Sequence, residues 1–337
     1  MNADPGIPSR ILVLKPSSLG DIVHTLPAVR AMAQKFPETG ITWVVNPEWA
    51  PVLEGISWLE KVHLFPRREF RGIGGAWKGW RWMKKLRNEK ADWVLDFQGL
   101  LRSGLMAHYS RAPVRLGLSD ARENASLAYT KVAEVSPSEH SVERYCRLAA
   151  LAGVPVTEEE RFLFDLPTGK KMDLTLDLAN AVVLHPFSRG QDKSLDWETV
   201  MHLIKCLNPL TVILVGKGAP ALSGKLPENT HNLLDQTALP ELIWLMRQAR
   251  GVISVDSGPM HLGAAVNPNV WGIHGWSDPR KVGPYSKTAQ AWKGGRFWKM
   301  EDWHLPENHP LLADPDILLP GKTEIFEIAQ TVLKQWQ

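Results

Sequence analysis

The chain has 337 residues, of which 44% are hydrophobic and 22% are charged, a balance that excludes a mainly disordered protein. Its length corresponds to about two domains, and its net charge of +3 is too small to require a nucleic-acid partner. Two cysteines are too few for a disulfide framework, so a reducing cytoplasm is expected. No segment is apolar over the ~18 residues needed to cross a bilayer, and the N-terminus lacks the pattern of a signal peptide. Any membrane role is therefore expected to be peripheral.

The first half of the chain alternates predicted strands and helices. It opens with a strand at Ile11–Lys15, a turn of small residues, and a helix that begins near Asp21. Further strands are predicted at Ile41–Val45, Val62–Phe65 and Trp93–Leu95, and a helix at Ala76–Arg87. This alternation predicts a mostly parallel sheet with helices on both faces.

The same alternation restarts after a polar stretch, Leu166–Leu178, which we interpret as a linker. The predicted strands of the second half are Ala181–His185, Thr211–Val215, Val252–Val255 and Val270–Ile273. The predicted helices are Asp196–Cys206, Leu239–Ala249, one that opens at Gly258, and Glu324–Trp336. Two such halves predict two Rossmann-like domains with a cleft between them, and sheets of this kind bind ligands at the carboxyl ends of their strands.

The first motif with chemical potential is the turn after the first strand, Lys15-Pro-Ser-Ser-Leu-Gly-Asp21. A glycine lets the backbone approach a ligand closely, and the start of a helix favours anions. The motif is neither a dinucleotide-binding glycine motif nor a P-loop. Two interpretations of Asp21 stay open, a helix cap or a group that acts on a ligand.

A second motif is the loop that follows the strand ending at His185. It contains Ser188, Arg189 and Lys193, a hydroxyl and two cations that are suited to hold a phosphate group. The alternative is a solvated loop without a ligand.

A third motif, Asp256-Ser257-Gly258, stands between a strand and the start of a helix. Backbone N–H groups at that position bind anions, and Asp256 is placed to meet a hydroxyl or an ammonium group. His261 lies on the same helical turn as Ser257. The alternative is that Asp256 caps the helix and His261 lies at the edge of the core.

The segment 67–87 is basic and contains Trp77, Trp80 and Trp82. This combination suits an anionic membrane surface, and RNA or a solvated helix face with inward-packed indoles are the alternatives. A second Trp-rich segment, 292–303, has no assigned role. The cations of the first segment are Arg67, Arg68, Arg71, Lys78, Arg81, Lys84, Lys85 and Arg87.

Metal-binding motifs are not recognisable in the sequence. Asp314 and Asp316 have a D-x-D spacing, but they stand in a late, proline-rich stretch and not directly after a predicted strand. No H-E-x-x-H or C-x-x-C pattern occurs. We therefore expect neither a metal nor a cofactor.

Together the motifs resemble glycosyltransferase family 9, the bacterial ADP-heptose:lipopolysaccharide heptosyltransferases. In the first half, the residues that carry the resemblance are Ile11 to Ala28 and Asp96 to Ser103. In the second half they are the loop that ends at Lys193 and the run from Ser254 to Ala265. The match spans most of residues 10–285 in the order of the family's motifs.

The resemblance implies an α/β protein of GT-B fold, in which the parallel sheets of two Rossmann-like domains face an interdomain cleft. We expect an acceptor domain at 1–168, a donor-nucleotide domain at 178–321 and a C-terminal helix at 322–337. The implied reaction is an inverting, metal-independent transfer of a heptose from ADP-heptose to the lipopolysaccharide inner core, on a lipid A–Kdo or heptose acceptor. Another NDP-sugar transferase or epimerase of the same fold is the alternative, and a non-catalytic protein on this scaffold is a third.

The resemblance also implies roles for single residues. Asp21 falls on the family's general base, and Lys193 falls on a contact to the donor diphosphate that supports catalysis. The donor base contact falls on Asn232 or Asp235, and this alternative stays open. The motifs and the resemblance together give Ser188, Arg189, Asp256, Ser257, Gly258 and His261 as donor-binding residues. They give Ser18, Gly20, Arg67, Arg68, Arg71 and Arg122 as acceptor-binding residues.

The expected partners follow from that reaction. They are the nucleotide-sugar donor ADP-heptose, a lipopolysaccharide precursor as acceptor, and the anionic surface of the inner membrane, with no nucleic acid. The expected location is the cytoplasm, peripheral at the inner face of the bacterial inner membrane.

Overall fold

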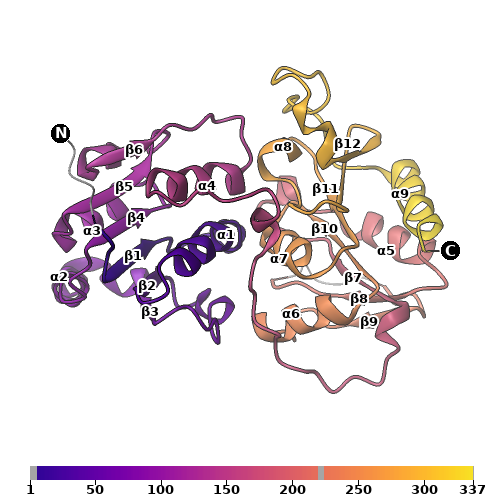
Figure 1. The fold of residues 1–337 in the computed structure, drawn as a ribbon. Helices are drawn as coiled ribbons and strands as arrows, with labels where there is room; N and C mark the ends of the chain where they lie inside the picture. The colour runs from indigo at the N-terminus through magenta and orange to yellow at the C-terminus, as the bar shows by residue number, and fades with distance from the viewer. Residues whose placement is uncertain (1–5, 219–223, 337) are drawn as a thin grey trace. The chain divides into compact units, whose positions relative to one another are not determined.

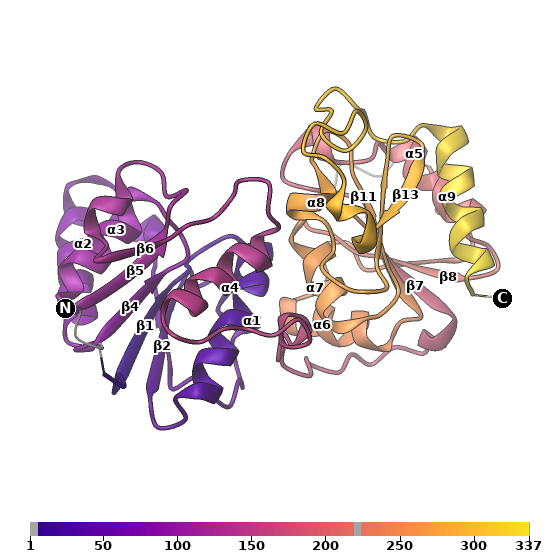
Figure 2. The same cartoon turned by 45° about the horizontal axis from the view of Figure 1, so that its top comes forward.

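The chain divides into two compact units, Met1–Pro167 and Thr168–Gln337. A computed structural model describes residues 6–218 and 224–336, and each unit is built around a sheet of its own (Figures 1 and 2). Within those residues no helix has the length and apolar character needed to span a bilayer.

The N-terminal unit contains a six-stranded parallel sheet in the order β3-β2-β1-β4-β5-β6. Its strands are β1 (Arg10–Leu14), β2 (Gly40–Val45), β3 (Lys61–Leu64), β4 (Trp93–Asp96), β5 (Val114–Leu118) and β6 (Lys131–Ala133). The central strands are almost wholly buried, as expected when helices cover both faces of a parallel sheet. The order is that of a Rossmann fold and reverses between β1 and β4, where such sheets bind ligands.

Two pairs of helices cover the N-terminal sheet (Figures 1 and 2). The helices are α1 (Leu19–Lys35), α2 (Gly72–Arg87), α3 (Leu101–Ser110) and α4 (Ser141–Leu151), with short 3-10 segments η1 (Ala50–Val52), η2 (Arg67–Phe70), η3 (Ala125–Ala128) and η4 (Glu160–Phe162). α1 packs against α4, and α2 packs against α3. Trp82 and Leu86 of α2 share one core cluster with Met106 of α3 and with Leu12 and Val94 of the sheet. α2 and α3 therefore cover the same face of the sheet.

The C-terminal unit contains a seven-stranded sheet in the order β13-β12-β11-β10-β7-β8-β9. Its strands are β7 (Ala181–His185), β8 (Thr211–Leu214), β9 (Thr230–Asn232), β10 (Gly251–Val255), β11 (Val270–Ile273), β12 (Gln290–Lys293) and β13 (Arg296–Lys299). All pairs are parallel except β12 with β13. The strand order reverses between β7 and β10, so the second unit repeats the Rossmann arrangement of the first.

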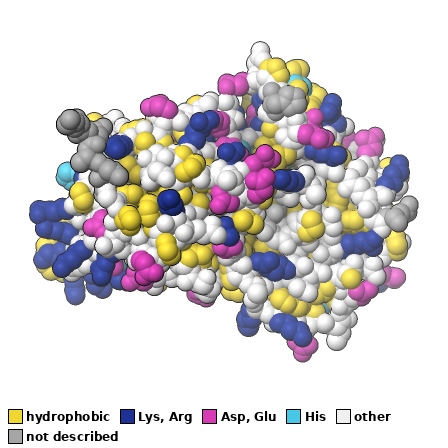
Figure 3. Space-filling model, in the orientation of Figure 1, with side chains coloured by type: hydrophobic (Ala, Val, Ile, Leu, Met, Phe, Trp, Pro, Cys, Tyr) yellow, Lys and Arg dark blue, Asp and Glu magenta, His cyan; other side chains and the backbone are white. Residues whose placement is uncertain are grey.

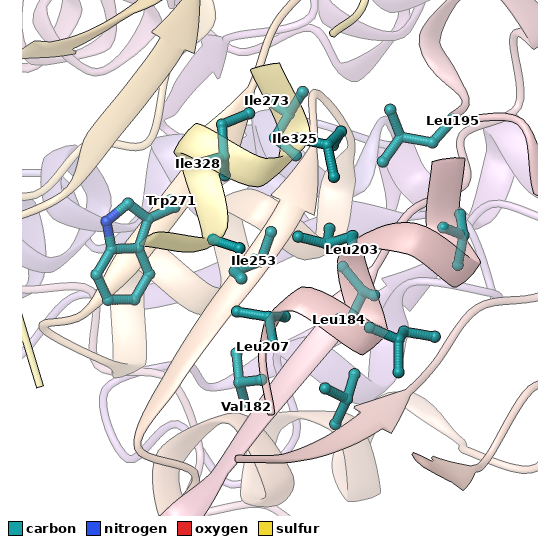
Figure 4. Close-up of a cluster of buried hydrophobic side chains, with 14 of the residues drawn as sticks. Val182, Leu184, Leu195, Leu203, Leu207, Ile253, Trp271, Ile273, Ile325 and Ile328 are labelled. Carbon is teal, nitrogen blue, oxygen red and sulfur yellow. The ribbon is translucent and has the colours of Figure 1, made fainter. Parts of the chain in front are cut away.

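Helices and one large apolar cluster complete the C-terminal unit. The helices are α5 (Trp197–Cys206), α6 (Leu239–Gln248), α7 (Gly258–Val266), α8 (Pro279–Val282) and α9 (Lys322–Lys334), with 3-10 segments η5 (Leu178–Asn180), η6 (Gln191–Lys193) and η7 (Met300–His304). α9 packs against α5, and Figure 4 shows its Ile325 and Ile328 beside Leu203 of α5 and Ile253 of β10. The last helix is thus part of the core of this unit.

The predicted elements do not include α3, α4, β5 and β6 of the first unit or β9, β12 and β13 of the second. Arg115 and Gly117 interrupt the apolar pattern of β5, and β6 has only three residues. α3 contains Gly104, which weakens a helix prediction, but a Cβ there would lie 3.0 Å from the Ala125 backbone of η3. The Trp-rich segment 292–303 spans the end of β12, all of β13 and most of η7, and Trp298 in β13 is buried.

Candidate active site

Motif residues gather in each unit at the point where the strand order reverses. In the N-terminal unit, β1 leads into the turn that holds Asp21, and the neighbouring β4 ends at Asp96. In the C-terminal unit, β7 leads into the loop that ends at Lys193, and the neighbouring β10 is followed by Asp256. The carboxyl ends of adjacent parallel strands meet at one edge, so each pair of segments forms one site.

Asp21 is the third residue of α1, and its two carboxylate oxygens have different partners. Oδ2 accepts hydrogen bonds from the backbone N–H of Ser18 at 3.1 Å and from its hydroxyl at 2.6 Å. This is a cap of the helix start, so the structural interpretation of Asp21 is correct. Oδ1 accepts a bond from the Tyr145 hydroxyl at 3.1 Å and lies 3.6 Å from the Lys15 ammonium. The side chain keeps 37% of its surface exposed, which leaves the carboxylate accessible to a ligand.

Buried donors keep this carboxylate ionised. Burial by itself favours the neutral acid, but the charge of Lys15 and the hydrogen bonds from Ser18 and Tyr145 outweigh it and lower the pKa of Asp21 to about 2. Lys15 is only 3% exposed and donates to the Tyr145 hydroxyl at 2.8 Å and to the Phe97 carbonyl at 2.9 Å. Burial lowers the pKa of Lys15, while the charges of Asp21 and Asp96 oppose that shift. Sequence analysis missed Tyr145, because it comes from α4, far along the chain.

Asp96 at the end of β4 organises the adjoining loop. It accepts bonds from the backbone N–H groups of Gln98 at 2.9 Å and Gly99 at 3.1 Å, and from the Tyr129 hydroxyl at 2.8 Å. Burial raises the pKa of this carboxyl, and the hydrogen bonds it accepts oppose the shift. Its full burial and its loop-holding bonds make Asp96 a structural group beside the site.

The arginines predicted to bind an acceptor are exposed in segments next to that loop. The Arg122 backbone N–H donates to the Gly99 carbonyl at 2.8 Å, which ties its segment to the end of β4. The pKa of Arg102 in α3 is lowered first by burial and next by the charge of nearby Arg67, while the charge of Glu123 raises it. Arg102 therefore belongs to the same cationic region, although sequence analysis did not single it out. Arg67 and Arg68 lie in η2, Arg71 precedes α2, Ser18 is exposed before α1, and Gly20 is buried in its first turn.

Lys193 and Asp256 form the centre of the C-terminal site. The Lys193 ammonium lies 2.5 Å from Asp256 Oδ2 and 4.3 Å from the centre of the Trp276 ring. Asp256 is 8% exposed and Lys193 is 25% exposed. Burial would raise the pKa of Asp256, but positive charge at His274 and Lys193 lowers it. Because burial lowers the pKa of His274 to about 4, that imidazole is neutral at pH 7, and Lys193 is the cation in direct contact with Asp256.

The loop after β11 adds Trp276 to the C-terminal site, and the sequence did not predict this contribution. Trp276 donates its Nε1–H to Asp192 at 2.7 Å and so holds the indole against the Lys193 segment. Buried Lys293 binds four carbonyl oxygens, two of them in this loop and two further along the chain. The carbonyls belong to Trp276, Ser277, Leu312 and Asp314, at 2.8–3.3 Å. Arg280 likewise binds the carbonyls of Leu305, Pro306 and Glu307.

The start of α7 is prepared for an anion. Ser257 is its N-terminal flanking residue, but its hydroxyl lies 3.2 Å from Nδ1 of buried His185, and within the described residues no side chain caps this helix. Burial lowers the pKa of His185 to about 4, so the imidazole is neutral. The backbone from Gly258 onward therefore presents the positive end of a helix dipole.

The remaining predicted donor residues lie in the loop after β7, in α7 and after β9. Ser188 is held by its backbone N–H, which donates to the Ser194 hydroxyl at 2.8 Å, and Arg189 is exposed beside it. His261 is buried in α7 and lies near enough to Asp256 to help lower the pKa of that carboxyl. Asp235 accepts a bond from the Gly218 backbone N–H at 2.8 Å. Across the described ranges 6–218 and 224–336, no three His, Cys, Asp or Glu side chains are grouped so that they could hold a metal ion.

Comparison with known proteins gives a consistent result. The profile of "Glycosyltransferase family 9 (heptosyltransferase)" matches residues 79–310. "Lipopolysaccharide heptosyltransferase 1" of Escherichia coli K12 is 30% identical over 311 residues, which cover 85% of this chain and 94% of that protein. "Lipopolysaccharide core heptosyltransferase OpsX" of Haemophilus influenzae is 22% identical and covers 83% of this chain and 82% of its own.

Solved structures show the same likeness. The structure "E. coli heptosyltransferase WaaC with ADP" is 26% identical, with a TM-score of 0.68 over 84% of this chain and 92% of that one. "Structure of E. coli ADP-heptose lps heptosyltransferase II", at 20% identity, supports the fold alone, with a TM-score of 0.69 over 97% of this chain and 99% of the other. The predicted GT-B fold is therefore confirmed. The chain belongs to glycosyltransferase family 9 and is a glycosyltransferase of the heptosyltransferase type.

Proposed function

We propose that this enzyme transfers a heptose from ADP-heptose to the inner core of a lipopolysaccharide precursor, with inversion at the anomeric carbon and without a metal ion. Asp21 is the general base, and Lys193 with the start of α7 holds the diphosphate of the donor. The acceptor is lipid A–Kdo or a heptose already attached to it. The enzyme works in the cytoplasm, peripheral at the inner face of the inner membrane.

One observation supports this function more than any other. At its switch point the N-terminal unit exposes an ionised carboxylate. The C-terminal unit holds an ammonium group beside a helix start that no side chain of the described residues caps. A glycosyl transfer needs these two kinds of group, a proton acceptor for the attacking hydroxyl and positive charge for the departing diphosphate. The relatives named for heptosyltransfer to lipopolysaccharide support the choice of sugar and acceptor.

The chemistry follows from these groups. The acceptor oxygen attacks the anomeric carbon, and the bond from that carbon to the β-phosphate oxygen breaks. ADP leaves with the bonding electron pair, and the hydroxyl proton passes to Asp21. Because the pKa of Asp21 is about 2, this carboxylate is a weak base, so the proton moves late, when the new C–O bond is already well formed.

On the donor side, Lys193 stabilises the negative charge that collects on the diphosphate. Its ammonium also contacts Asp256, which holds the cation in place beside the start of α7. The α7 backbone adds a second source of positive charge. Together they supply the stabilisation that a divalent cation gives in other transferases.

The test is a product analysis by mass spectrometry. ADP-heptose is offered with a set of truncated lipopolysaccharides, with and without a chelator. We expect ADP and one acceptor heavier by a single heptose, with unchanged yield under chelation, and inversion in the NMR spectrum of the new linkage. Consumption of ADP-heptose without any acceptor would instead indicate an epimerase or a hydrolase, and preference for another NDP-sugar would overturn the choice of donor.

A further inference from the structure

The helical layer formed by α2 and α3 leaves large apolar side chains in water. Since both helices turn Trp82 and Met106 toward the sheet core, their opposite sides face solvent. On α2, Trp77 and Trp80 are 61% and 43% exposed, and on α3, Leu101 and Leu105 are 48% and 55% exposed. Exposed bulky apolar residues that are concentrated on neighbouring helices are typical of a surface that binds a protein, a ligand or a membrane.

A third segment extends this surface. η3 packs directly on α3, because Gly104 lets the two backbones approach. Its Leu127 is 87% exposed. We call the outer sides of α2, α3 and η3 together the α2–α3 face.

The structure separates the three tryptophans that the sequence places together. Trp82 is buried and donates its Nε1–H to the Leu64 carbonyl at 2.7 Å, so the expectation that all three lie at an interface is wrong for this residue. The rings of Trp77 and Trp80 instead stack on each other, with centroids 4.8 Å apart. The Lys84 ammonium lies 4.1 Å from the centre of the Trp80 ring. Two indoles and a cation are thus arranged on one side of α2.

The charge around these indoles has one sign. Eight Lys and Arg residues stand between positions 67 and 87 against a single acid, Glu69, and all eight cations are exposed. Glu69 lies 3.6 Å from one of them, Lys78. Figure 3 shows blue side chains gathered on the part of the N-terminal unit where Figure 1 places α2. This excess exists although the whole chain carries only +3.

We propose that the α2–α3 face binds the surface of an anionic lipid bilayer, with Trp77, Trp80, Leu101, Leu105 and Leu127 entering the headgroup region. Cations attract acidic headgroups, and indole rings settle between headgroups and acyl chains. The exposed leucines would be buried in the acyl-chain region of a bilayer. An RNA partner would instead contact the cations and the stacked rings and leave the leucines exposed to water. The inference deepens the proposed function, because a lipid-linked acceptor lies in such a surface.

The test is cosedimentation of the whole chain with vesicles of phosphatidylglycerol and phosphatidylethanolamine, or of phosphatidylcholine alone. We expect binding to the anionic vesicles at low salt, weaker binding as salt shortens the Debye length to about 10 Å at 0.1 M, and far less binding to the neutral ones. The double variant Trp77→Ser, Trp80→Ser should bind the anionic vesicles at least about tenfold more weakly than the parent. Leu318→Ser with Phe326→Ser, two apolar residues exposed on the other unit, should leave binding unchanged.

Charge reversal provides a second arm. Arg81→Glu, Lys84→Glu and Lys85→Glu together should weaken vesicle binding at least about a hundredfold, since each cation contributes about fivefold, or about 1 kcal/mol. The same change at exposed Lys35, Lys205 and Lys334 should have a much smaller effect. ADP affinity, measured by calorimetry, should not change in either triple variant.

The outcomes separate the two proposals. Vesicle binding that survives the tryptophan pair or the α2 charge reversal would overturn the membrane assignment while leaving the transferase function untouched. Binding to a single-stranded RNA that matches or exceeds binding to anionic vesicles would replace it with the nucleic-acid interpretation. Failure of the parent protein to bind ADP, with normal vesicle binding, would count against the donor site and not against this surface.

Discussion

The two units contain the same ion pair with its exposure reversed. In the N-terminal unit the lysine is buried and the carboxylate is exposed, at 3% for Lys15 and 37% for Asp21. In the C-terminal unit the carboxylate is buried and the lysine is more exposed, at 8% for Asp256 and 25% for Lys193. Each pair lies at the switch point of a Rossmann-like sheet.

This reversal explains how one scaffold supplies two opposite charges. A buried partner attracts the exposed charge strongly, because little water lies between the two groups to screen them. The first unit therefore presents an anion, Asp21, and the second a cation, Lys193. The charge that each site offers to a ligand depends on which member of its ion pair faces solvent.

The largest effect should come from the exposed anion. Asp21→Asn removes the proton acceptor and should lower turnover by about 10²–10⁴-fold. Folding should change little, because Asn also caps helices and keeps an oxygen for Ser18. Turnover and thermal unfolding are measured together, with Asp173→Asn, an exposed aspartate outside the site, as the control. Near-normal turnover in folded Asp21→Asn would leave only the helix cap.

The exposed cation should have the next largest effect. Lys193→Ala should weaken ADP binding by about 10- to 100-fold, because a hydrogen bond to a charged group contributes about 1.5–3 kcal/mol. Lys193→Arg keeps the charge and should retain most of the affinity. The measurement is calorimetry with ADP. Equal affinity in the alanine variant and the parent would show that this loop does not hold the diphosphate.

Removing the buried cation should change the pH profile and leave the base in place. The pKa of Asp21 is depressed, so the parent keeps an ionised base well below neutral pH. Lys15→Met removes the opposite charge, and the pKa of Asp21 should rise by about 1–3 units. The acid limb of kcat/KM should move upward by the same amount, with the smallest loss of activity above pH 7. If the acid limb of the kcat/KM profile stays at the same pH in Lys15→Met, the charge of Lys15 does not control the pKa of Asp21.

The smallest effect should come from the neutral donor. Tyr145→Phe removes one hydrogen bond from Asp21 Oδ1 and keeps the ring packed in α4. The acid limb should move in the same direction as in Lys15→Met, by less than about one unit, because no charge is lost. A shift larger than that of Lys15→Met would assign the main control of Asp21 to the hydroxyl.

The sequence predicts the charged residues that follow strands better than the neutral groups that act on them from far along the chain. Asp21, Lys193 and Asp256 follow predicted strands, so local pattern was sufficient to select them. Tyr145 and His185 act on partners that lie 124 and 72 residues away, a relation that periodicity does not contain. The fold class was predictable because most strands are continuous apolar runs, whereas polar or glycine-interrupted elements such as α3 and β5 were not.

A usable signal was present for the tryptophans. Trp77 and Trp80 are three residues apart and share one side of a helix, whereas Trp82 follows Trp80 by two and points to the other side. Helical spacing alone therefore separates the stacked pair from the buried ring. Composition by itself hides this distinction.

The two buried cations behind the donor loop have a consequence for sequence variation. Lys293 and Arg280 bind the segment that contains Leu305 to Asp314 through backbone carbonyl oxygens. Every amino acid carries such an oxygen, so this attachment constrains the path of the backbone and leaves the identity of the side chains open. The segment should accept many substitutions and few insertions or deletions, and the two cations themselves should be the intolerant positions.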